Sequence, residues 1–321
     1  MGDGGRESIL RHWGRDTDRR SEAPGPVLLA VGETMALVAP AVAGRVVDAE
    51  LFRLDAGGAE SNVAAHVAAL GQQARWFSRL GTDPLGDRVA RQLAMRGVQL
   101  DGVIRDPDHP TGLYVKDPGN GVRYYRAGSA ASHLTPADVD AVDWTDVEVL
   151  HISGITAILS PSAAAFLDAL IARARSRDVA VSFDVNHRAA LWDAATAAPT
   201  LAALARQADI VFVGRDEAEG LWGTPTAEAT RALLGEVPEL VVKDGDVGAT
   251  VFVDDEVVFE PAHRVEVVDV VGAGDAFAGG YLAALLGGAD HGARLRAGHE
   301  RAALTLTTTG DSIIEEVPVI R

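Results

Sequence analysis

The chain has 321 residues, no cysteine, and a formal net charge of -17 at pH 7. This charge disfavours binding to nucleic acid or to anionic membranes, which leaves a small-molecule role. The lack of cysteine excludes disulfides, thiolate catalysis and cysteine metal sites. No apolar run in the sequence approaches the length of a membrane span.

The first 26 residues are polar and charged and show no apolar periodicity. They lack the apolar core of a secretory signal, so we expect residues 1–26 to be a disordered tail on a cytoplasmic protein. No internal repeat or clear linker follows. Residues 27–321 are therefore expected to form one domain.

From Val27 onward, apolar runs that predict strands alternate with stretches of helical spacing. The predicted strands are VLLAVG (27–32), ARWFSRLG (74–81), VEVLHISG, VAVSFDVN, ADIVFVG and LVVKDG, and the first helices are ESNVAAHVAALG (60–71), with Gly71 as its C-cap, and DPLGDRVARQLAMRG (83–97). This alternation predicts an α/β fold with a mostly parallel central sheet and helices on both faces. Ligands bind such sheets beyond the carboxyl ends of the strands.

Two segments break the alternation. Residues 34–56 and 103–128 contain short alternating stretches joined by turn residues, as in TGLYVKDPGNGVRYYR. They predict a small β lid packed over the edge of the main sheet.

The stretch DVVGAGDAFAGG (269–280) places Asp275 directly after a glycine turn, where a helix is expected to begin. Such a turn presents backbone N–H groups and a positive dipole end that suit an anion. Asp275 could cap the helix, or it could stand beside a bound phosphate and take a proton from the attacking group. The common phosphate loops do not match, because Phe277 replaces the third glycine of a dinucleotide fingerprint and no Gly-Lys pair exists for a Walker A loop.

Two separated segments resemble one known family. DVVGAGDAFAGGYLAAL is similar to the second signature of the PfkB (ribokinase-like) carbohydrate kinases, whose core is D-x-x-G-A-G-D, and GGAESNVAAHVAALG (57–71) is similar to the first. Their order and distance agree with the family, and the resemblance runs from about Val27 to the end of the chain. It implies a ribokinase-like fold, dependence on ATP and Mg²⁺, and a possible homodimer formed through the lid strands.

The resemblance also implies roles for the glycine turn. Gly272, Ala273 and Gly274 would form an anion hole for the transferring phosphate, and Asp275 would be the base that activates a sugar hydroxyl. Phosphoryl transfer chiefly requires positioning and charge stabilisation, which backbone N–H groups at a helix start can supply. The family resemblance therefore favours a catalytic base at Asp275 over a helix cap.

The first signature fits a sugar site. Gly57 and Gly58 would let the backbone approach the substrate, and Asn62 offers both a donor and an acceptor to hydroxyl groups; the alternative for Asn62 is an ordinary residue on a helix surface. Glu33 follows the first strand, where related kinases carry another residue that contacts the sugar.

Two arginine-containing stretches bear on the substrate. On a strand, Tyr124 and Arg126 of RYYRAGSAAS (123–132) share one face and Tyr125 points to the other. Arg188 ends the D-x-N-x-R run of FDVNHRAALW (183–192). A sugar-acid carboxylate would use two arginines, which a neutral hexose does not need. Both stretches resemble those of 2-keto-3-deoxygluconate kinases, although each arginine could also belong to a structural salt bridge.

The resemblance places further residues near the nucleotide: Lys243, Gly245 and Gly248 in VVKDGDVGATVF, His299 and Ala302 beside adenine, and Glu217, which would order water around magnesium. Gly214 replaces the asparagine of the family's N-x-x-E element, and Asn186 or a water would supply that contact. The nine histidines show no metal-ligand spacing.

The sequence thus predicts a kinase that phosphorylates 2-keto-3-deoxygluconate with ATP. Within the same class the alternative is a fructokinase-like enzyme for a neutral ketose. Outside it, a non-catalytic sugar- or nucleotide-sensing relative would have no use for a base at Asp275, and an NAD-dependent oxidoreductase is disfavoured by the missing fingerprint.

Overall fold

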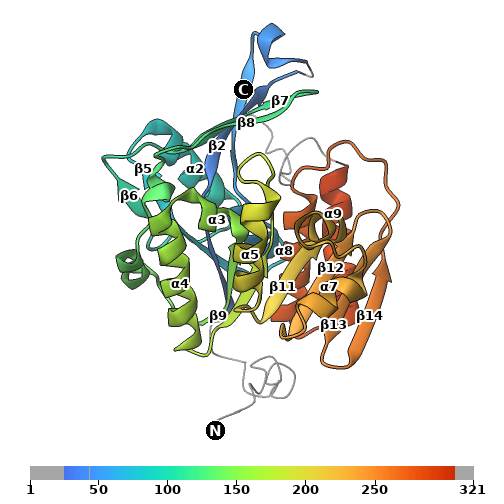
Figure 1. Cartoon of the computed structure of the whole chain (residues 1–321). Helices are drawn as coiled ribbons and strands as arrows, with labels where there is room; N and C mark the ends of the chain where they lie inside the picture. Colours follow the sequence, from blue (N-terminus) through green and yellow to red (C-terminus); the bar gives the residue numbers. More distant parts are fainter. Residues whose placement is uncertain (1–24, 43, 308–321) are drawn as a thin grey trace.

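A computed structural model describes residues 25–42 and 44–307, so the expected tail, residues 1–26, lies outside the described residues except for its last two. An eight-stranded sheet with the order β14-β13-β12-β11-β10-β9-β1-β4 forms the centre of the molecule (Figure 1). Its strands are β1 (Val27–Val31), β4 (Gln73–Phe77), β9 (Val147–Ser153), β10 (Ala180–Asp184), β11 (Ile210–Gly214), β12 (Glu239–Asp244), β13 (Gly248–Val253) and β14 (Glu256–Pro261).

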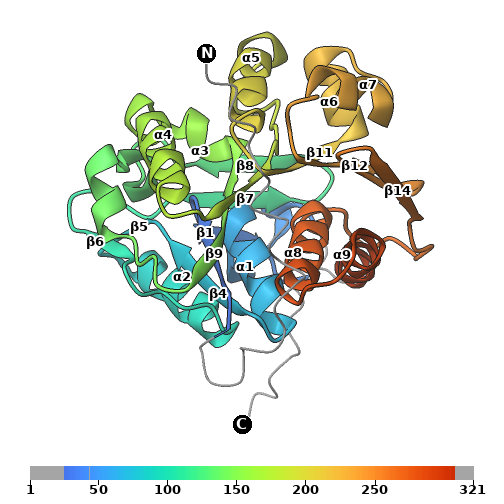
Figure 2. The same ribbon diagram turned by 90° about the horizontal axis from the view of Figure 1, so that it is seen from below.

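The predicted alternation of strands and helices is confirmed. Neighbouring strands from β4 through β12 pair in parallel, and β13 and β14 extend the sheet as an antiparallel hairpin. Helices cover both faces of the sheet (Figure 2). They are α1 (Ala59–Ala69), α2 (Pro84–Met95), α3 (Gly154–Leu159), α4 (Pro161–Arg175), α5 (Ala194–Ala205), α6 (Arg215–Trp222), α7 (Ala227–Leu233), α8 (Ala273–Leu286) and α9 (His291–Leu306).

The central strands are apolar at consecutive positions because both faces of the sheet are buried. Along β1, the side chains of Val27 and Leu29 join one apolar core, and those of Leu28 and Ala30 join the other. The first core includes side chains of α4 and α5, and the second includes those of α1 and α8. A run such as VLLAV therefore fits a central strand between two helical layers.

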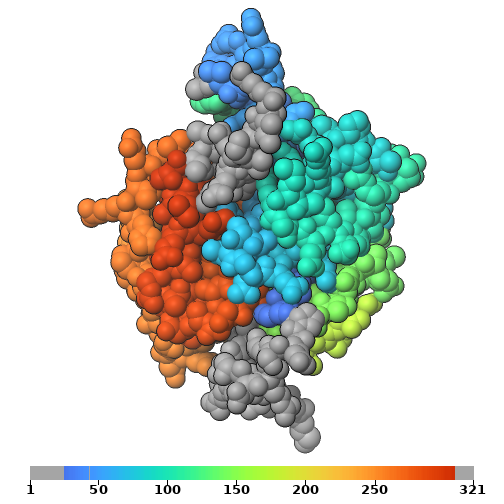
Figure 3. Space-filling view, turned by 180° about the vertical axis from the view of Figure 1, so that it is seen from behind, coloured from blue at the N-terminus to red at the C-terminus, as the bar shows by residue number. Residues whose placement is uncertain are grey.

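Helix α8 packs against α1 and α9 at very short range. A side chain at Gly279 would place its Cβ 2.5 Å from Cβ of His66 on α1, and one at Gly280 would place it 2.3 Å from the carbonyl oxygen of Ala297 on α9. The pair of glycines therefore allows α8 to lie between the two helices. From behind, the red surface of the C-terminal helices borders the blue of α1 (Figure 3).

The predicted lid is confirmed as a separate four-stranded sheet, β3-β2-β7-β8. Its strands are β2 (Met35–Pro40), β3 (Phe52–Gly57), β7 (Leu113–Asp117) and β8 (Gly121–Tyr125). The strand register pairs Leu37 with Tyr114 and Tyr114 with Tyr124, so these side chains share the inner face of the lid sheet. Val38, Leu54 and Tyr125 belong to the outer face.

The structure corrects two details of the sequence prediction. ARWFSRLG forms two strands, because the chain leaves the main sheet after β4 and pairs β5 (Arg79–Gly81) with β6 (Ile104–Asp106). Strand β6 therefore belongs to this two-stranded sheet, although it lies within segment 103–128. Apolar periodicity predicts a strand but does not specify its partner.

Among the helices of residues 25–42 and 44–307, none has the length and apolar character that a bilayer crossing requires.

Candidate active site

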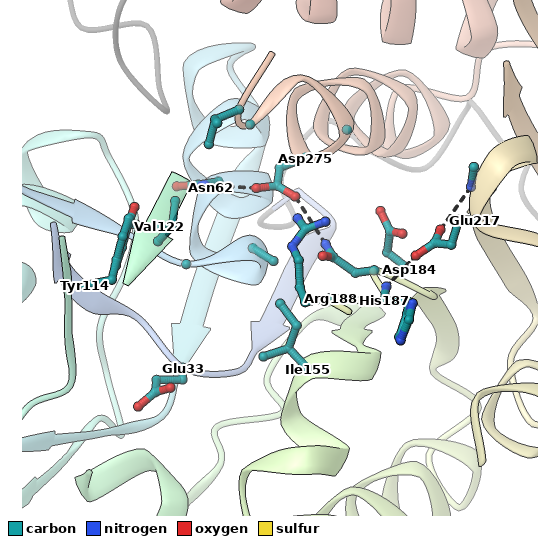
Figure 4. Close-up of a pocket in the computed structure, with 18 of the residues that line it drawn as sticks. Glu33, Asn62, Tyr114, Val122, Ile155, Asp184, His187, Arg188, Glu217 and Asp275 are labelled. Carbon is teal, nitrogen blue, oxygen red and sulfur yellow. Dashed lines mark hydrogen bonds between the residues drawn. The ribbon is translucent and has the colours of Figure 1, made fainter. Parts of the chain in front are cut away.

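A cavity of about 640 Å³ lies between the lid sheet and the carboxyl ends of the parallel strands, a size in the range of small-molecule sites. Its lining includes Glu33, Met35, Gly57, Gly58, Asn62, Tyr114, Val122, Tyr124, Arg126, Asp184, Asn186, His187, Arg188, Glu217, Lys243, Gly272, Gly274 and Asp275. In the close-up, Asp275 lies between Glu33 and Tyr114 on one side and Glu217 on the other (Figure 4). The cavity thus has a lid end and a main-sheet end, with the candidate base between them.

Asp275 is the third residue of α8 and does not cap the helix. The N-cap is Gly272, which has a φ of 81° and no side-chain cap hydrogen bond. The Asp275 carboxylate instead accepts hydrogen bonds from Asn62 Nδ2 at 2.9 Å and from Asn186 Nδ2 at 3.4 Å (Figure 4). Because these bonds aim the carboxylate into the cavity, the helix-cap hypothesis is wrong.

Burial raises the pKa of Asp275 from its ordinary value of 3.8 to about 6. The hydrogen bond from Asn62 and the positive charge of Arg188 oppose this rise. A carboxylate that is ionised at neutral pH and holds a proton near pH 6 is suited to general base catalysis.

Gly272 and Gly274 line the cavity, and Ala273 is the first residue of α8. A side chain at Gly274 would place its Cβ 3.6 Å from Nζ of Lys243, so the ammonium lies beside the turn. Lys243 Nζ also donates to Asp184 Oδ2 at 3.1 Å. Burial acts against the charge of Lys243, but Asp184 and Glu217 raise its pKa above the ordinary value, and the side chain remains a cation. The turn therefore combines a helix start with a fixed positive charge.

Backbone amides hold Glu217 in place. Its Oε2 accepts from the N–H of Gly214 at 3.1 Å, and its Oε1 accepts from the N–H of His187. Burial and then the charge of Asp184 raise the pKa of Glu217. Two carboxylates close together in a buried site favour a bound cation, which would relieve their repulsion.

The carboxylates of Asp184 and Glu217 could hold Mg²⁺ only together with other ligands. Within residues 25–42 and 44–307, no group of three or more Asp, Glu or His side chains could hold a metal ion. Magnesium in phosphate-transfer sites usually takes one or two carboxylates, and water and phosphate oxygens complete its shell. Asp184 and Glu217 are the carboxylates in position for this, and the backbone bonds of Glu217 make a contact through water reasonable.

Two amide oxygens in the cavity lack partners. Asn62 and Asn186 each donate Nδ2 to Asp275, whereas Oδ1 of each is buried without a hydrogen-bond partner among the described residues. A buried, unpaired acceptor is costly unless a ligand or water satisfies it. Both oxygens are therefore candidate acceptors for substrate hydroxyl groups, and Asn62 is not an ordinary surface residue.

The structure places Tyr124 and Arg126 together in the cavity, with Arg126 Cζ 5.6 Å from the centroid of the Tyr124 ring. Tyr125 points away and is 61% exposed. Arg188 lines the cavity too, and its side chain extends toward Asp275 (Figure 4). The two predicted arginines therefore reach one cavity from different elements.

Glu33 borders the cavity as predicted, and its side chain also contacts Arg126. Its carboxylate forms an ion pair with Arg126 and accepts a hydrogen bond from Ser129 Oγ. The Glu33 side chain is 1% exposed, and its Oε2 lies in the ion pair but has no hydrogen-bond partner among the described residues. Glu33 therefore supports Arg126, and its contact with the sugar stays a prediction.

Gly57 and Gly58 also have a more local role than expected. A Cβ on Gly57 would lie 2.0 Å from Tyr114 Oη, and one on Gly58 would lie 2.4 Å from the carbonyl oxygen of Glu33. Both glycines border the cavity, and they also permit close approach to Tyr114 of the lid and to Glu33, which follows β1.

Four predicted nucleotide contacts are not part of the described lining of this cavity: Gly245, Gly248, His299 and Ala302. Gly245 and Gly248 shape the turn between β12 and β13, with φ values of 50° and 154°. His299 is buried against Phe277, and its Nε2 lies 3.1 Å from the carbonyl oxygen of Glu260. The His299 ring packs inside the protein, and the nucleotide contacts of these four residues stay a prediction.

The sequence interpretation did not single out several residues of the cavity lining, and two of them have a clear place in the site. Asp184 is the last residue of β10, inside the D-x-N-x-R run. Its position at the carboxyl end of a predicted strand could have identified it as a site residue from the sequence. Tyr114 lies in the lid stretch TGLYVK and shares the inner face with Tyr124. Its inward direction depends on the register between β7 and β2, which no local pattern specifies.

Comparison with known proteins agrees with this geometry. Residues 27–317 match the model of the pfkB family carbohydrate kinases. A 2-dehydro-3-deoxygluconokinase of Bacillus subtilis (strain 168) is 36% identical over 289 residues, which cover 87% of this chain and 89% of the relative.

Two crystal structures extend the comparison. That of the 2-dehydro-3-deoxygluconokinase of Thermotoga maritima has a TM-score of 0.81 and 27% identity, over 90% of this chain and 95% of that one. A fructokinase variant of Vibrio cholerae O395, bound to fructose, ADP and potassium ion, has a TM-score of 0.80 and 26% identity, over 90% and 95% of the two chains.

Proposed function

The chain belongs to the PfkB family of carbohydrate kinases, and we propose that its substrate is 2-keto-3-deoxygluconate, also called 2-dehydro-3-deoxygluconate, which it converts to the 6-phosphate with ATP. The observation that carries this proposal is the presence of Arg126, Arg188 and Asp275 around one cavity. The arginines provide charge for a sugar-acid carboxylate, and Asp275 provides a base for a hydroxyl group. The names of the relatives from Bacillus subtilis and Thermotoga maritima support the same substrate.

The sugar acid would lie at the lid end of the cavity. Its carboxylate would pair with Arg126 and Arg188, and its hydroxyl groups would donate to the unpaired oxygens of Asn62 and Asn186. The inner face of the lid, with Tyr114 and Tyr124, would cover the sugar and exclude water.

Phosphoryl transfer would take place beside Asp275. As the sugar hydroxyl oxygen forms its bond to the γ-phosphorus, the hydroxyl proton passes to the Asp275 carboxylate. The bond from the γ-phosphorus to the bridging oxygen breaks, and ADP leaves. Backbone N–H groups at the start of α8 and the ammonium of Lys243 would stabilise the charge on the transferring group. Mg²⁺ held near Asp184 and Glu217 would neutralise phosphate charge.

A fructokinase-like activity is the second candidate. Arg126 already has an anionic partner in Glu33, which reduces the positive charge available to a substrate carboxylate. The Vibrio cholerae structure shows that this fold also accommodates fructose. The preference between the sugar acid and a neutral ketose therefore depends on the net positive charge that Arg126, Glu33 and Arg188 together present to the substrate.

A homodimer formed through the lid is part of the proposal. On the outer face of the lid sheet, Phe52, Leu54 and Tyr125 are 44%, 36% and 61% exposed. Alternating strand residues bring these apolar side chains onto one face, and a second copy of the chain would bury them.

A coupled assay of ATP consumption over sugar acids and neutral ketoses tests the proposed substrate. We expect 2-keto-3-deoxygluconate to give a higher kcat/KM than fructose. A higher value for fructose would favour the second candidate. ATP consumption with neither sugar would reject both, and the non-catalytic sensing role would replace them.

A further inference from the structure

Among the described residues, an ion pair joins the lid to the segment that leads into the glycine turn, residues 269–274. Lys116 Nζ, on strand β7 of the lid, contacts Asp269 Oδ2 in the loop before Gly272. The two side chains are 18% and 21% exposed. The contact links positions 153 residues apart, so it belongs to the tertiary structure and not to a local turn.

Asp269 organises the approach to the turn. Its Oδ1 accepts a hydrogen bond from the N–H of Val271 at 3.1 Å. The backbone N–H groups of Val268 and Asp269 donate to the carbonyl oxygen of Leu306 at the end of α9, at 2.8 and 3.3 Å. The carboxylate therefore holds the segment that leads into Gly272, and Val270 and Val271 of that segment line the cavity.

The ion pair has an electrostatic consequence for phosphate binding. When the lid is closed, the ammonium of Lys116 compensates the charge of Asp269. If the lid moved away, a carboxylate without this partner would remain close to a turn that receives an anionic phosphate group. Repulsion between like charges in a partly buried place disfavours that arrangement. The contact is only partly buried, so its contribution to overall stability is small, and its effect on the site is the more important one.

We propose that Lys116 is a positioning residue that couples closure of the lid over the sugar to the phosphate-binding competence of turn 269–274. The inference rests on the proposed kinase function. In the closed state Lys116 compensates the charge of Asp269, and the turn has the shape that phosphoryl transfer to the sugar requires. In the open state transfer is disfavoured, so little ATP is lost to water before a sugar has bound.

The test compares Lys116→Met, Lys116→Arg and Asp269→Asn with the wild-type enzyme. Lys116→Met should lower kcat by about tenfold, within the usual range of coupling between two sites. Its KM for the sugar should stay within about threefold, because Lys116 is not among the described residues that line the cavity. Lys116→Arg, which retains the charge, should recover most of the lost kcat.

Two further readouts separate coupling from a structural effect. The ratio of ATP hydrolysis without sugar to sugar phosphorylation should rise in Lys116→Met. The double variant Lys116→Met, Asp269→Asn should be no slower than the slower single variant, because both remove the same contact. Arg123→Met is the matched control, since it removes an exposed cation from the outer face of the same lid and should leave both rates unchanged.

Failure of this inference is distinguishable from failure of the proposed function. If the wild-type enzyme phosphorylates a sugar and Lys116→Met does so with the same kcat and the same hydrolysis ratio, the coupling is rejected alone. If the effects of Lys116→Met and Asp269→Asn on kcat simply add, the coupling is also rejected. A wild-type protein that phosphorylates no sugar would reject the proposed function and this inference with it.

Discussion

Asp275 illustrates how much a single residue depends on distant parts of the chain. Two asparagines, one on α1 and one after β10, aim its carboxylate into the cavity, and burial raises its pKa to about 6. The glycine turn before it made Asp275 a candidate base from the sequence alone. Its contact with Asn62 spans 213 residues and depends on the packing of α1 against α8. No local pattern predicts that contact.

The pKa of Asp275 leads to a pH dependence of catalysis. Protonation removes the base, so activity should be lost as the pH falls through about 6. We expect kcat/KM for the sugar to have an acidic limb near pH 6, because this parameter reports ionisations of the free enzyme. A pH–rate profile measured at constant ionic strength checks this. A profile that stays flat down to pH 4.5 would mean that Asp275 does not act as the base.

The two arginines should respond differently to substitution. Arg188 is exposed, so Arg188→Ala should leave folding intact and raise the KM for the sugar acid roughly 10- to 100-fold, the loss of one charge-assisted contact. Arg126→Ala should raise KM as well and should also lower the melting temperature, because it leaves Glu33 buried without its cation. Steady-state kinetics with the sugar acid and with fructose, alongside thermal unfolding, measure both effects.

Arg123→Ala, on the outer face of the lid, is the matched control for both arginines. An equal rise in KM for fructose and for the sugar acid would contradict recognition of a carboxylate.

At the scale of elements, the sequence predicted most of the main sheet and the lid segments, because strands buried on both faces and alternating surface strands have distinct patterns. It did not predict that β6 leaves the lid to pair with β5, nor that Tyr114 points inward. Both depend on which strand lies next to which, and on the register between them. The adenine contacts stay a prediction, and the packing of His299 on Phe277 of a neighbouring helix is a further contact that no local pattern predicts.

The lid sheet should close over the sugar. Saturating sugar should slow amide hydrogen exchange in residues 34–56 and in β7 and β8, since closure over the ligand protects their backbone. The amides of β6 form an internal control, because this strand pairs outside the lid and should change little. Mass spectrometry of exchange with and without sugar measures residues 34–56 and the strands β6, β7 and β8. Equal protection in β6 and in the lid strands would indicate general stabilisation instead of closure.

At the scale of the whole molecule, the formal net charge of -17 and the apolar outer face of the lid act in opposite directions on self-association. We expect the apolar face to prevail and the chain to be a dimer that is strengthened by salt, which screens the repulsion between copies. Tyr125→Asp should shift the sedimentation coefficient toward the monomer. Val257→Asp, at a comparably exposed valine of β14, is the control and should leave the dimer intact. A wild-type protein that sediments as a monomer at all salt concentrations would contradict the lid interface.

The central claim, a sugar kinase with Asp275 as its base, is tested most directly by Asp275→Asn, measured for both turnover and thermal stability. The amide keeps the shape of the side chain, so affinity for ATP and sugar should change little, while kcat should fall by about 10²–10⁴-fold. Folding raises the pKa of Asp275 from 3.8 to about 6, so the folded state favours the protonated carboxyl group. The contribution of this group to the free energy of unfolding is complete below pH 3.8 and is lost as the pH rises through about 6. At pH 8 the variant should therefore melt at the same temperature as the wild type or higher. A variant that keeps nearly normal kcat on its best sugar would contradict the account.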